Sequence, residues 1–197
     1  LSAMLVSAAD IEGWTPQHEG VYSLNADGNL VIKGKENTGL FLNKEITGDF
    51  TLEFQANSSE IVEGTDQKFT LSLFAKDQKD WMTGYWFRFI GTSVQLNDGT
   101  DKVNLYREDT AGACTVNIGS MNDVKVEYKG GKLTFYVNGT NIGEFTPADT
   151  TGKYIAVGAN YFANDASLIN AEFTVKGFKL TMGGETVTFF GDAENIG

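Results

Sequence analysis

Cysteine, histidine and proline are scarce in this 197-residue sequence, with one, one and two residues respectively. The lone Cys114 excludes an internal disulfide framework and a cysteine-based zinc site. The lone His18 removes most metal and triad chemistry that depends on histidine, and we expect it to be a surface loop residue rather than a base. These shortages exclude several classes of function before any motif is considered.

Long apolar runs and positive charge are also lacking. No stretch approaches the roughly 18 apolar residues that a membrane span needs, so we expect none. The chain has 15 basic and 26 acidic side chains, a net charge of −11 that argues against a nucleic-acid partner. The hydrophobic content of 41% is ample for a core, so the sequence predicts an acidic globular chain.

The length suits one domain with short ends. We divide the chain into an N-terminal arm or leader remnant at 1–11, one domain at 12–191 and a C-terminal tail at 192–197. The small and apolar residues 1–9 fit either the remnant of a secretory leader or a short docking strand. In the second case this segment could add to a sheet edge of a neighbouring copy.

Apolar and polar residues alternate with a period of two over most of the chain, as in half-buried β-strands. No stretch of twelve residues carries an apolar stripe at helical spacing. The alternating runs lie at 50–57, 69–74, 85–89, 124–129, 133–138 and 173–182. Glycine, asparagine and aspartate pairs such as Asn138-Gly139 separate the runs and suit tight turns. The sequence therefore predicts an all-β, two-sheet antiparallel jelly-roll β-sandwich.

One pair of predicted strands carries a recognisable pattern. The run Asp123-Val-Lys-Val-Glu-Tyr-Lys-Gly-Gly-Lys-Leu-Thr-Phe-Tyr-Val-Asn-Gly139 resembles paired strands of laminin-G-like members of the concanavalin A-like lectin/glucanase superfamily. The order of Gly13-Trp14, Gly28–Ile32, Gly48–Phe54 and Phe173–Leu180 is similar to that of 3-keto-disaccharide hydrolase-like domains. The resemblance covers about residues 12–182 and implies the jelly-roll fold, because its matching residues are core and turn positions.

The alternation also predicts which side chains point outward. If Phe50, Leu52 and Phe54 face the core, their neighbours on the same strand face solvent. The outward set then offers aromatic rings beside carboxylate, amide and guanidinium groups, which suits sugars. The predicted ligand-binding residues from strands are Glu53, Gln55, Phe74, Trp86 and Arg88. The resemblance would place Trp86 and Arg88 on the ligand-bearing sheet; alternatively, a loop such as 78–84 covers Trp86 and Phe74 as a second small core.

Two aromatic loops supply further candidates. Trp81 follows the polar stretch 76–80, and Asn160 and Tyr161 begin a segment of aromatic and amide residues. Such aromatics either rim a ligand site or act as packing lids. We add Trp81, Asn160 and Tyr161 to the predicted ligand-binding residues.

Catalytic motifs are absent from the sequence. The Glu-x-Asp-x-(x)-Glu strand motif of the superfamily's glucanases does not occur, and Asp49 and Glu53 lie about 13 Å apart along a strand, too far for a glycosidase pair. A cross-strand pair such as Glu53 with Glu127 stays open. We therefore predict no catalytic residue; if the protein is an enzyme, we expect a glycoside-processing hydrolase.

No cofactor is required by the sequence, but Ca²⁺ fits as a structural ion because hard oxygen ligands are abundant. Asp10, Glu12 and Asp192 could meet at one edge of the sandwich to hold it.

Three functions remain open at this point. The first is a non-catalytic carbohydrate-binding or adhesion domain, with a glycan or polysaccharide as partner, on a secreted or cell-surface protein of bacterial origin. The second is a glycan-processing hydrolase of the 3-keto-disaccharide type, and the third is a structural subunit that self-associates through residues 1–9.

Overall fold

The computed structural model describes residues 6–7, 11–34, 36–99, 104–106 and 115–192. Its strands form two sheets, and every pairing between the named strands is antiparallel. This confirms the predicted all-β sandwich. Among these residues, the only helical segments are two short 3-10 turns, η2 (Trp81–Thr83) and η4 (Ala166–Leu168). No described helix is long and apolar enough to cross a membrane.

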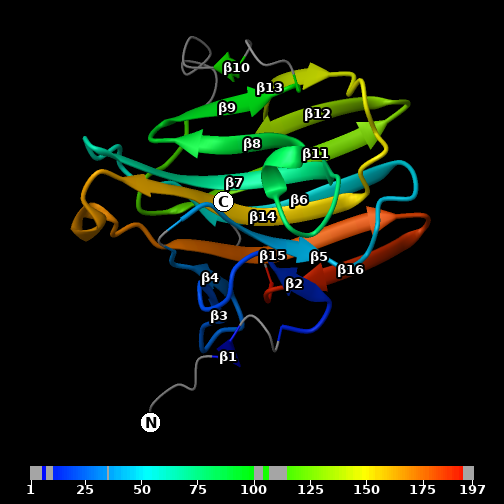
Figure 1. Ribbon diagram of the computed structural model, residues 1–197. Coiled ribbons are helices and arrows are strands. Elements are labelled where there is room, and N and C mark those ends of the chain that lie inside the picture. The colour runs from blue at the N-terminus through cyan, green and yellow to red at the C-terminus, as the bar shows by residue number, and fades with distance from the viewer. Residues whose placement is uncertain (1–5, 8–10, 35, 100–103, 107–114, 193–197) are drawn as a thin grey trace.

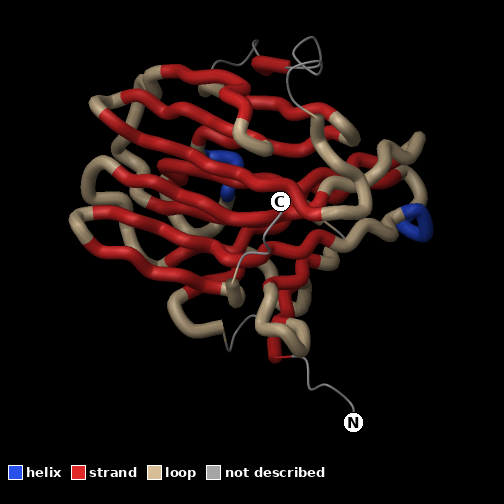
Figure 2. The backbone as a smooth tube through the Cα atoms, turned by 180° about the vertical axis from the view of Figure 1, so that it is seen from behind, coloured by secondary structure: helices blue, strands red, loops and turns tan. Residues whose placement is uncertain are grey.

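The nine-stranded sheet, here sheet A, has the order β1-β3-β4-β15-β6-β11-β12-β13, with β16 also paired to β15. Its strands are β1 (Val6–Ser7), β3 (Tyr22–Leu24), β4 (Leu30–Ile32), β6 (Phe50–Asn57), β11 (Met121–Lys129), β12 (Lys132–Val137), β13 (Thr140–Phe145), β15 (Phe173–Met182) and β16 (Glu185–Phe189). This sheet faces the viewer in Figure 2.

The seven-stranded sheet, here sheet B, has the order β10-β9-β8-β7-β14-β5-β2. Its strands are β2 (Trp14–Pro16), β5 (Thr38–Leu42), β7 (Thr65–Ala75), β8 (Tyr85–Ile90), β9 (Ser93–Asn97), β10 (Asn104–Tyr106) and β14 (Tyr154–Ala163). In Figure 1 sheet B lies in front, with β10 at the top and β2 near the bottom.

The core fills the space between the two sheets, and its aromatic rings make contacts from one sheet to the other. Phe54 of sheet A lies 5.8 Å from Phe69 of sheet B, and Phe87 of sheet B stacks on Phe135 of sheet A at 6.2 Å between ring centroids. All four rings are buried, so each contributes about 1.5–3 kcal/mol by burial. This packing confirms the predicted inward faces of β6, β8 and β12, and the buried Val124 and Val126 confirm that of β11.

The alternation breaks near the end of β7. Tyr154 pairs with Ala75 while Ala156 pairs with Ser72, so two residues of β7 stand opposite one residue of β14. This β-bulge holds Phe74 at a φ of 59° and reverses the direction of its side chain. The prediction that Phe74 faces outward is therefore wrong: its buried ring packs 5.0 Å from Tyr128 in the main core.

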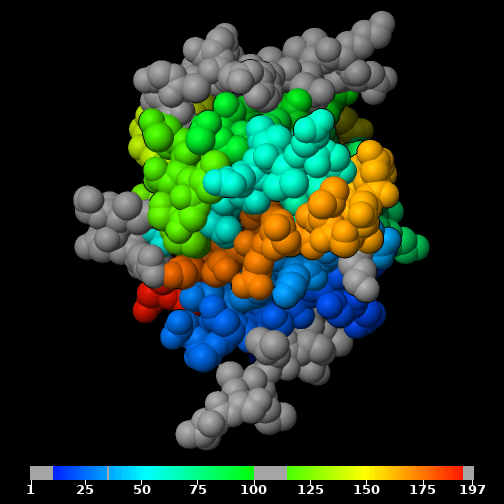
Figure 3. Space-filling view, turned by 90° about the vertical axis from the view of Figure 1, so that its left-hand side faces the viewer, coloured from blue at the N-terminus to red at the C-terminus, as the bar shows by residue number. Residues whose placement is uncertain are grey.

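The N-terminal strand pairs within its own chain, because Val6 and Ser7 of β1 lie opposite Leu24 and Ser23 of β3. This pairing counts against an arm that is free to add to a neighbouring copy. At the end of the sandwich seen in Figure 3, the loops at 58–64 and 164–172 meet, and the Asn164 N–H donates to the Gly64 carbonyl at 3.2 Å.

Candidate functional site

The outer face of sheet B carries a group of polar side chains that cross-strand register brings together. Arg88 on β8 stands opposite Thr70 on β7 and opposite Gln95 on β9. Asn160 on β14 stands opposite Lys68 on β7. We call these five residues the polar floor. Directly opposite residues on one face lie about 4.5–5.5 Å apart, so the polar floor is continuous across four strands.

Arg88 is fixed by its neighbours. Its Nε–H donates to the Gln95 Oε1 at 2.5 Å, and its guanidinium carbon lies 4.7 Å from the centroid of the Trp86 ring. Partial burial lowers the pKa of Arg88, because the charged form loses solvation. The structure thus confirms that Trp86 and Arg88 share one outer face, with the ring beneath the cation.

Lys68 lies diagonally across from Arg88 on the same face. It forms an ion pair with Asp66, and the Asn160 side-chain amide donates to the same carboxylate. Burial, and then the positive charge of Arg88, lower the pKa of Lys68 from 10.5 to about 8. The Asp66 carboxylate therefore contacts Lys68 and Asn160, while Arg88 is held by Gln95 and Trp86.

We predict that Lys68 titrates near pH 8, whereas Lys125, on the outer face of sheet A, titrates above its ordinary range because of its hydrogen bond to Glu127. Heteronuclear NMR of the lysine side chains would measure both midpoints. Arg88→Gln should raise the Lys68 midpoint by removing the adjacent charge and leave Lys125 unchanged. Because the unfolded chain holds the proton more tightly, the contribution of Lys68 to stability rises between pH 8 and 10.5. An ordinary Lys68 midpoint would contradict this.

The loop at 76–84 folds back over one end of the sheet and covers Trp86. Trp81, 1% exposed, meets Trp86 edge to face at 6.0 Å and belongs to a small second core with Phe41 and Ala156. The Ser72 hydroxyl anchors the turn by donating to the Trp81 carbonyl at 2.6 Å. Trp81 is therefore a packing lid, the alternative that the sequence left open, and Trp86 is only 8% exposed.

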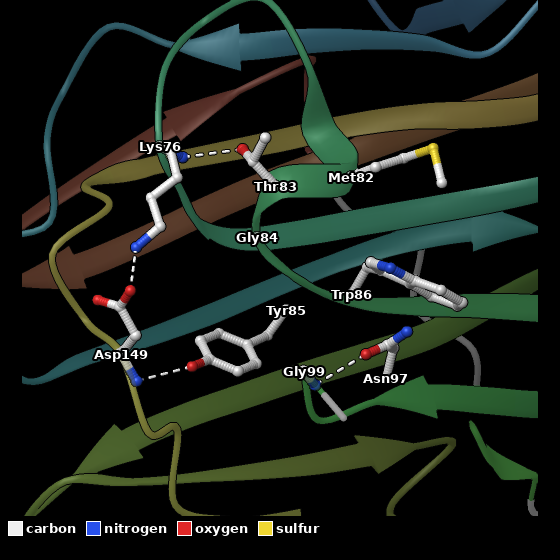
Figure 4. Close-up of a pocket in the computed structure, with 9 residues that line it drawn as sticks. All are labelled: Lys76, Met82, Thr83, Gly84, Tyr85, Trp86, Asn97, Gly99 and Asp149. Atoms are coloured by element: carbon white, nitrogen blue, oxygen red, sulfur yellow. Dashed lines mark hydrogen bonds and ion pairs between the residues drawn. The ribbon is translucent and has the colours of Figure 1, made fainter. Parts of the chain in front are cut away.

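Two depressions lie beside this loop, and Met82, 51% exposed at its tip, lines both of them. The first, shown in Figure 4, has a volume of about 300 Å³ and is lined by Trp86, Asn97 and the ion pair of Lys76 with Asp149. In it the Tyr85 hydroxyl accepts from the Asp149 N–H at 2.8 Å.

The second depression has a volume of about 460 Å³ and joins the other end of the polar floor. Asn160 and Phe162 line it together with His18 and Glu36, whose Nδ1 and Oε1 lie 3.5 Å apart. Phe162 is 60% exposed, although it is a large apolar side chain on a strand. An exposed ring near an amide and an ammonium group is suited to stack on an apolar face of a ligand.

Phe162 is the residue that the sequence reasoning missed, and Tyr161 was chosen in its place. Tyr161 lies on β14 rather than on a loop, and its side chain points into the main core with 3% exposure. Its hydroxyl lies 2.9 Å from the Ala171 carbonyl and 3.2 Å from that of Ile32. The alternation along this strand could have identified Phe162. Val157 and Ala159 face inward, so the same period of two turns Tyr161 inward and Phe162 outward.

Glu53 and Gln55 do face outward, but on sheet A, so the prediction of one shared face with Trp86 and Arg88 is wrong. There Gln55 donates to Asp123 at 2.9 Å and Glu53 lies 3.8 Å from the Lys179 ammonium. They line a separate depression of about 600 Å³ together with Tyr136.

The structure shows where the example of a cross-strand carboxylate pair, Glu53 with Glu127, lies. Glu53 pairs in register with Lys125, and Glu127 pairs with Thr51, so the two glutamates are diagonal neighbours on sheet A. Lys125 lies 3.1 Å from Glu127, whereas Glu53 faces Lys179. Only Glu53 lines the depression on that face, so these two carboxylates do not share a pocket.

The predicted calcium site stays a prediction. Asp10 lies outside the described residues, and Glu12 and Asp192 are exposed. Within the described ranges, no three acidic, histidine or cysteine side chains gather closely enough to hold a metal ion.

Comparisons with known proteins define the class of the fold. The chain is similar to a sialidase (12% identity, TM-score 0.62, covering 90% of this chain and 18% of that one). It is also similar to the alginate lyase from Corynebacterium sp. (16%, 0.56, covering 81% and 80%) and to the carbohydrate binding module CBM66 from Bacillus subtilis (11%, 0.52, covering 78% and 94%). These likenesses confirm the concanavalin A-like jelly roll. The chain spans less than a fifth of the sialidase's length.

The family follows from sequence. The model of the 3-keto-alpha-glucoside-1,2-lyase-like domain matches residues 4–189, so the chain belongs to that family. No curated protein matches the sequence. The family resemblance predicted from the strand pattern is thereby confirmed, and the chain is a carbohydrate-active domain of the concanavalin A-like fold.

Proposed function

We propose that this protein binds a glycan, without chemical turnover, on the outer face of sheet B. The observation that carries the proposal is the polar floor with the exposed Phe162 ring at one end. Sugar hydroxyls pair with amide and guanidinium groups, while the C–H faces of the sugar stack on an aromatic ring. The likeness to a carbohydrate binding module supports this choice, and a polysaccharide partner implies a secreted or cell-surface setting.

Phe162→Ala should weaken glycan binding by about tenfold or more, as truncation of a binding hot spot does. The residue is exposed, so the fold should be unaffected. A glycan array would identify a ligand for the wild type, and calorimetry would then compare the affinities of the wild type and the variant. Circular dichroism would confirm that the variant is folded.

The matched control is Tyr136→Ala, which removes an aromatic ring from the depression on sheet A. This variant should bind as the wild type does. Loss of binding in Tyr136→Ala but not in Phe162→Ala would move the site to the opposite sheet. A wild type that binds no glycan would remove the proposed function.

A second candidate, a lyase acting on a 3-keto-glucoside, draws on the name of the family and on one pair of residues. His18 and Glu36 face the same depression as Phe162, and a histidine held by a carboxylate can serve as a general base. Consumption of a 3-keto-glucoside by the wild type but not by His18→Ala would favour the lyase over the binding domain.

A further inference from the structure

We infer that the glycan bound on sheet B carries an anionic group, a carboxylate or a sulfate, that lies between Lys68 and Arg88. This inference rests on the proposed function and names the class of its ligand. It concerns two side chains that meet on the polar floor from neighbouring strands.

The described contacts of Arg88 use only part of its set of hydrogen-bond donors. Gln95 occupies its Nε–H and Trp86 lies under its plane, while no hydrogen bond from its terminal nitrogens is found within the described ranges. Lys68 already faces Asp66, whose carboxylate also accepts from Asn160. Glu60, which lines a small depression beside Lys68, is exposed to solvent.

The charges on this face are unbalanced in the direction that attracts an anion. Two partly buried cations lie on one face, and in the described residues the one carboxylate that contacts either of them is Asp66, which pairs with Lys68. The lowered pKa of Lys68 reflects burial and repulsion by Arg88. A second anion between them would offset that repulsion and form charge-assisted hydrogen bonds with a planar guanidinium.

Lys68 and Arg88 are only partly buried, so both keep some surface that a ligand can contact. The residues between them and across the next strand, Thr70 and Gly158, are small and stand opposite one another. The net charge of −11 repels a distant polyanion, but salt screens such repulsion beyond about 8–10 Å under physiological conditions. Short-range contacts with Lys68 and Arg88 therefore decide whether the anion binds.

The test uses ligand pairs that differ only in charge: a tetragalacturonate beside its methyl ester, and a sulfated galactan oligosaccharide beside its desulfated form. Calorimetry should show the wild type binding at least one anionic member about tenfold or more tightly than its neutral partner. Arg88→Gln and Lys68→Gln should each remove most of this preference. Because two separate variants are tested, the result can still be interpreted if one of them fails to fold. Lys125→Gln, on the opposite sheet, should retain the preference.

Raising the salt concentration should weaken only the anionic ligand. A preference for the sulfated member alone supports the inference and identifies the group as a sulfate. Equal affinity for charged and neutral members, with Phe162→Ala still disrupting both, would overturn the anionic inference and leave the proposed function intact. A wild type that binds none of the four ligands and nothing on the array would overturn both.

Discussion

Trp81→Ala should lower the free energy of unfolding by about 3–5 kcal/mol, the usual cost of truncating a buried aromatic residue. Trp81 is the centre of the small second core, and its loss would leave a cavity above Phe41 and Trp86. The 76–84 loop should then detach from sheet B. Urea unfolding, followed by circular dichroism, would measure the change.

Two neighbouring substitutions sharpen this expectation. Met82→Ala, one residue along and 51% exposed, should cost less than about 1 kcal/mol. Trp81→Phe should cost far less than Trp81→Ala, because the Trp81 Nε1–H is buried without a hydrogen-bond partner in the described part of the chain and phenylalanine has no such group. Equal stabilities for Trp81→Ala and Met82→Ala would refute the role of Trp81 as a lid.

The detached loop would also change the site. The Trp86 ring lies 4.7 Å from the Arg88 guanidinium carbon, and Trp81 packs edge to face against Trp86 at 6.0 Å. A loop that opens would let water reach Trp86, so Trp81→Ala should weaken glycan binding although Trp81 itself is buried beneath the face. The second small core therefore links the stability of the loop to the shape of the site.

Periodicity in the sequence was enough to predict the sandwich, because each strand must bury one face and the parity of Phe50, Leu52 and Phe54 admits one orientation. It failed at Phe74, where the bulge inserts an extra residue and reverses parity. A bulge depends on the register with β14, a strand about eighty residues away in the chain, and no local pattern contains that register.

The candidate site shows a second limit. Alternation distinguishes side chains that face the core from side chains that face solvent, but each of the two sheets has its own outer face. Glu53 and Arg88 lie on different outer faces, because β6 belongs to sheet A and β8 to sheet B. Only the order of the strands in the two sheets shows on which outer face each residue lies. The proximity of Lys68 to Arg88 could not be predicted for the same reason, because it depends on the register between β7 and β8.

Tyr161 and Phe162 are neighbours in sequence, but Tyr161 faces the core and Phe162 faces the proposed ligand. Tyr161→Ala should therefore destabilise the protein by about 3–5 kcal/mol. The Tyr161 ring packs 6.0 Å from Phe173 and against Gly34, where a Cβ atom would lie only 2.9 Å from the ring. Urea unfolding of Tyr161→Ala beside Phe162→Ala would measure the contrast, because the exposed Phe162 should cost less than about 1 kcal/mol.

Tyr161→Phe isolates the hydroxyl. It should cost about 0.5–1.5 kcal/mol, because the carbonyls of Ile32 and Ala171 lose a buried donor while the ring stays in place. Glycan affinity should be unchanged in Tyr161→Phe and reduced in Phe162→Ala, so that stability and binding follow different members of one dipeptide. Reduced affinity in a stable Tyr161→Phe variant would show that the inward residue also takes part in binding, contrary to the separation of the two faces by β14.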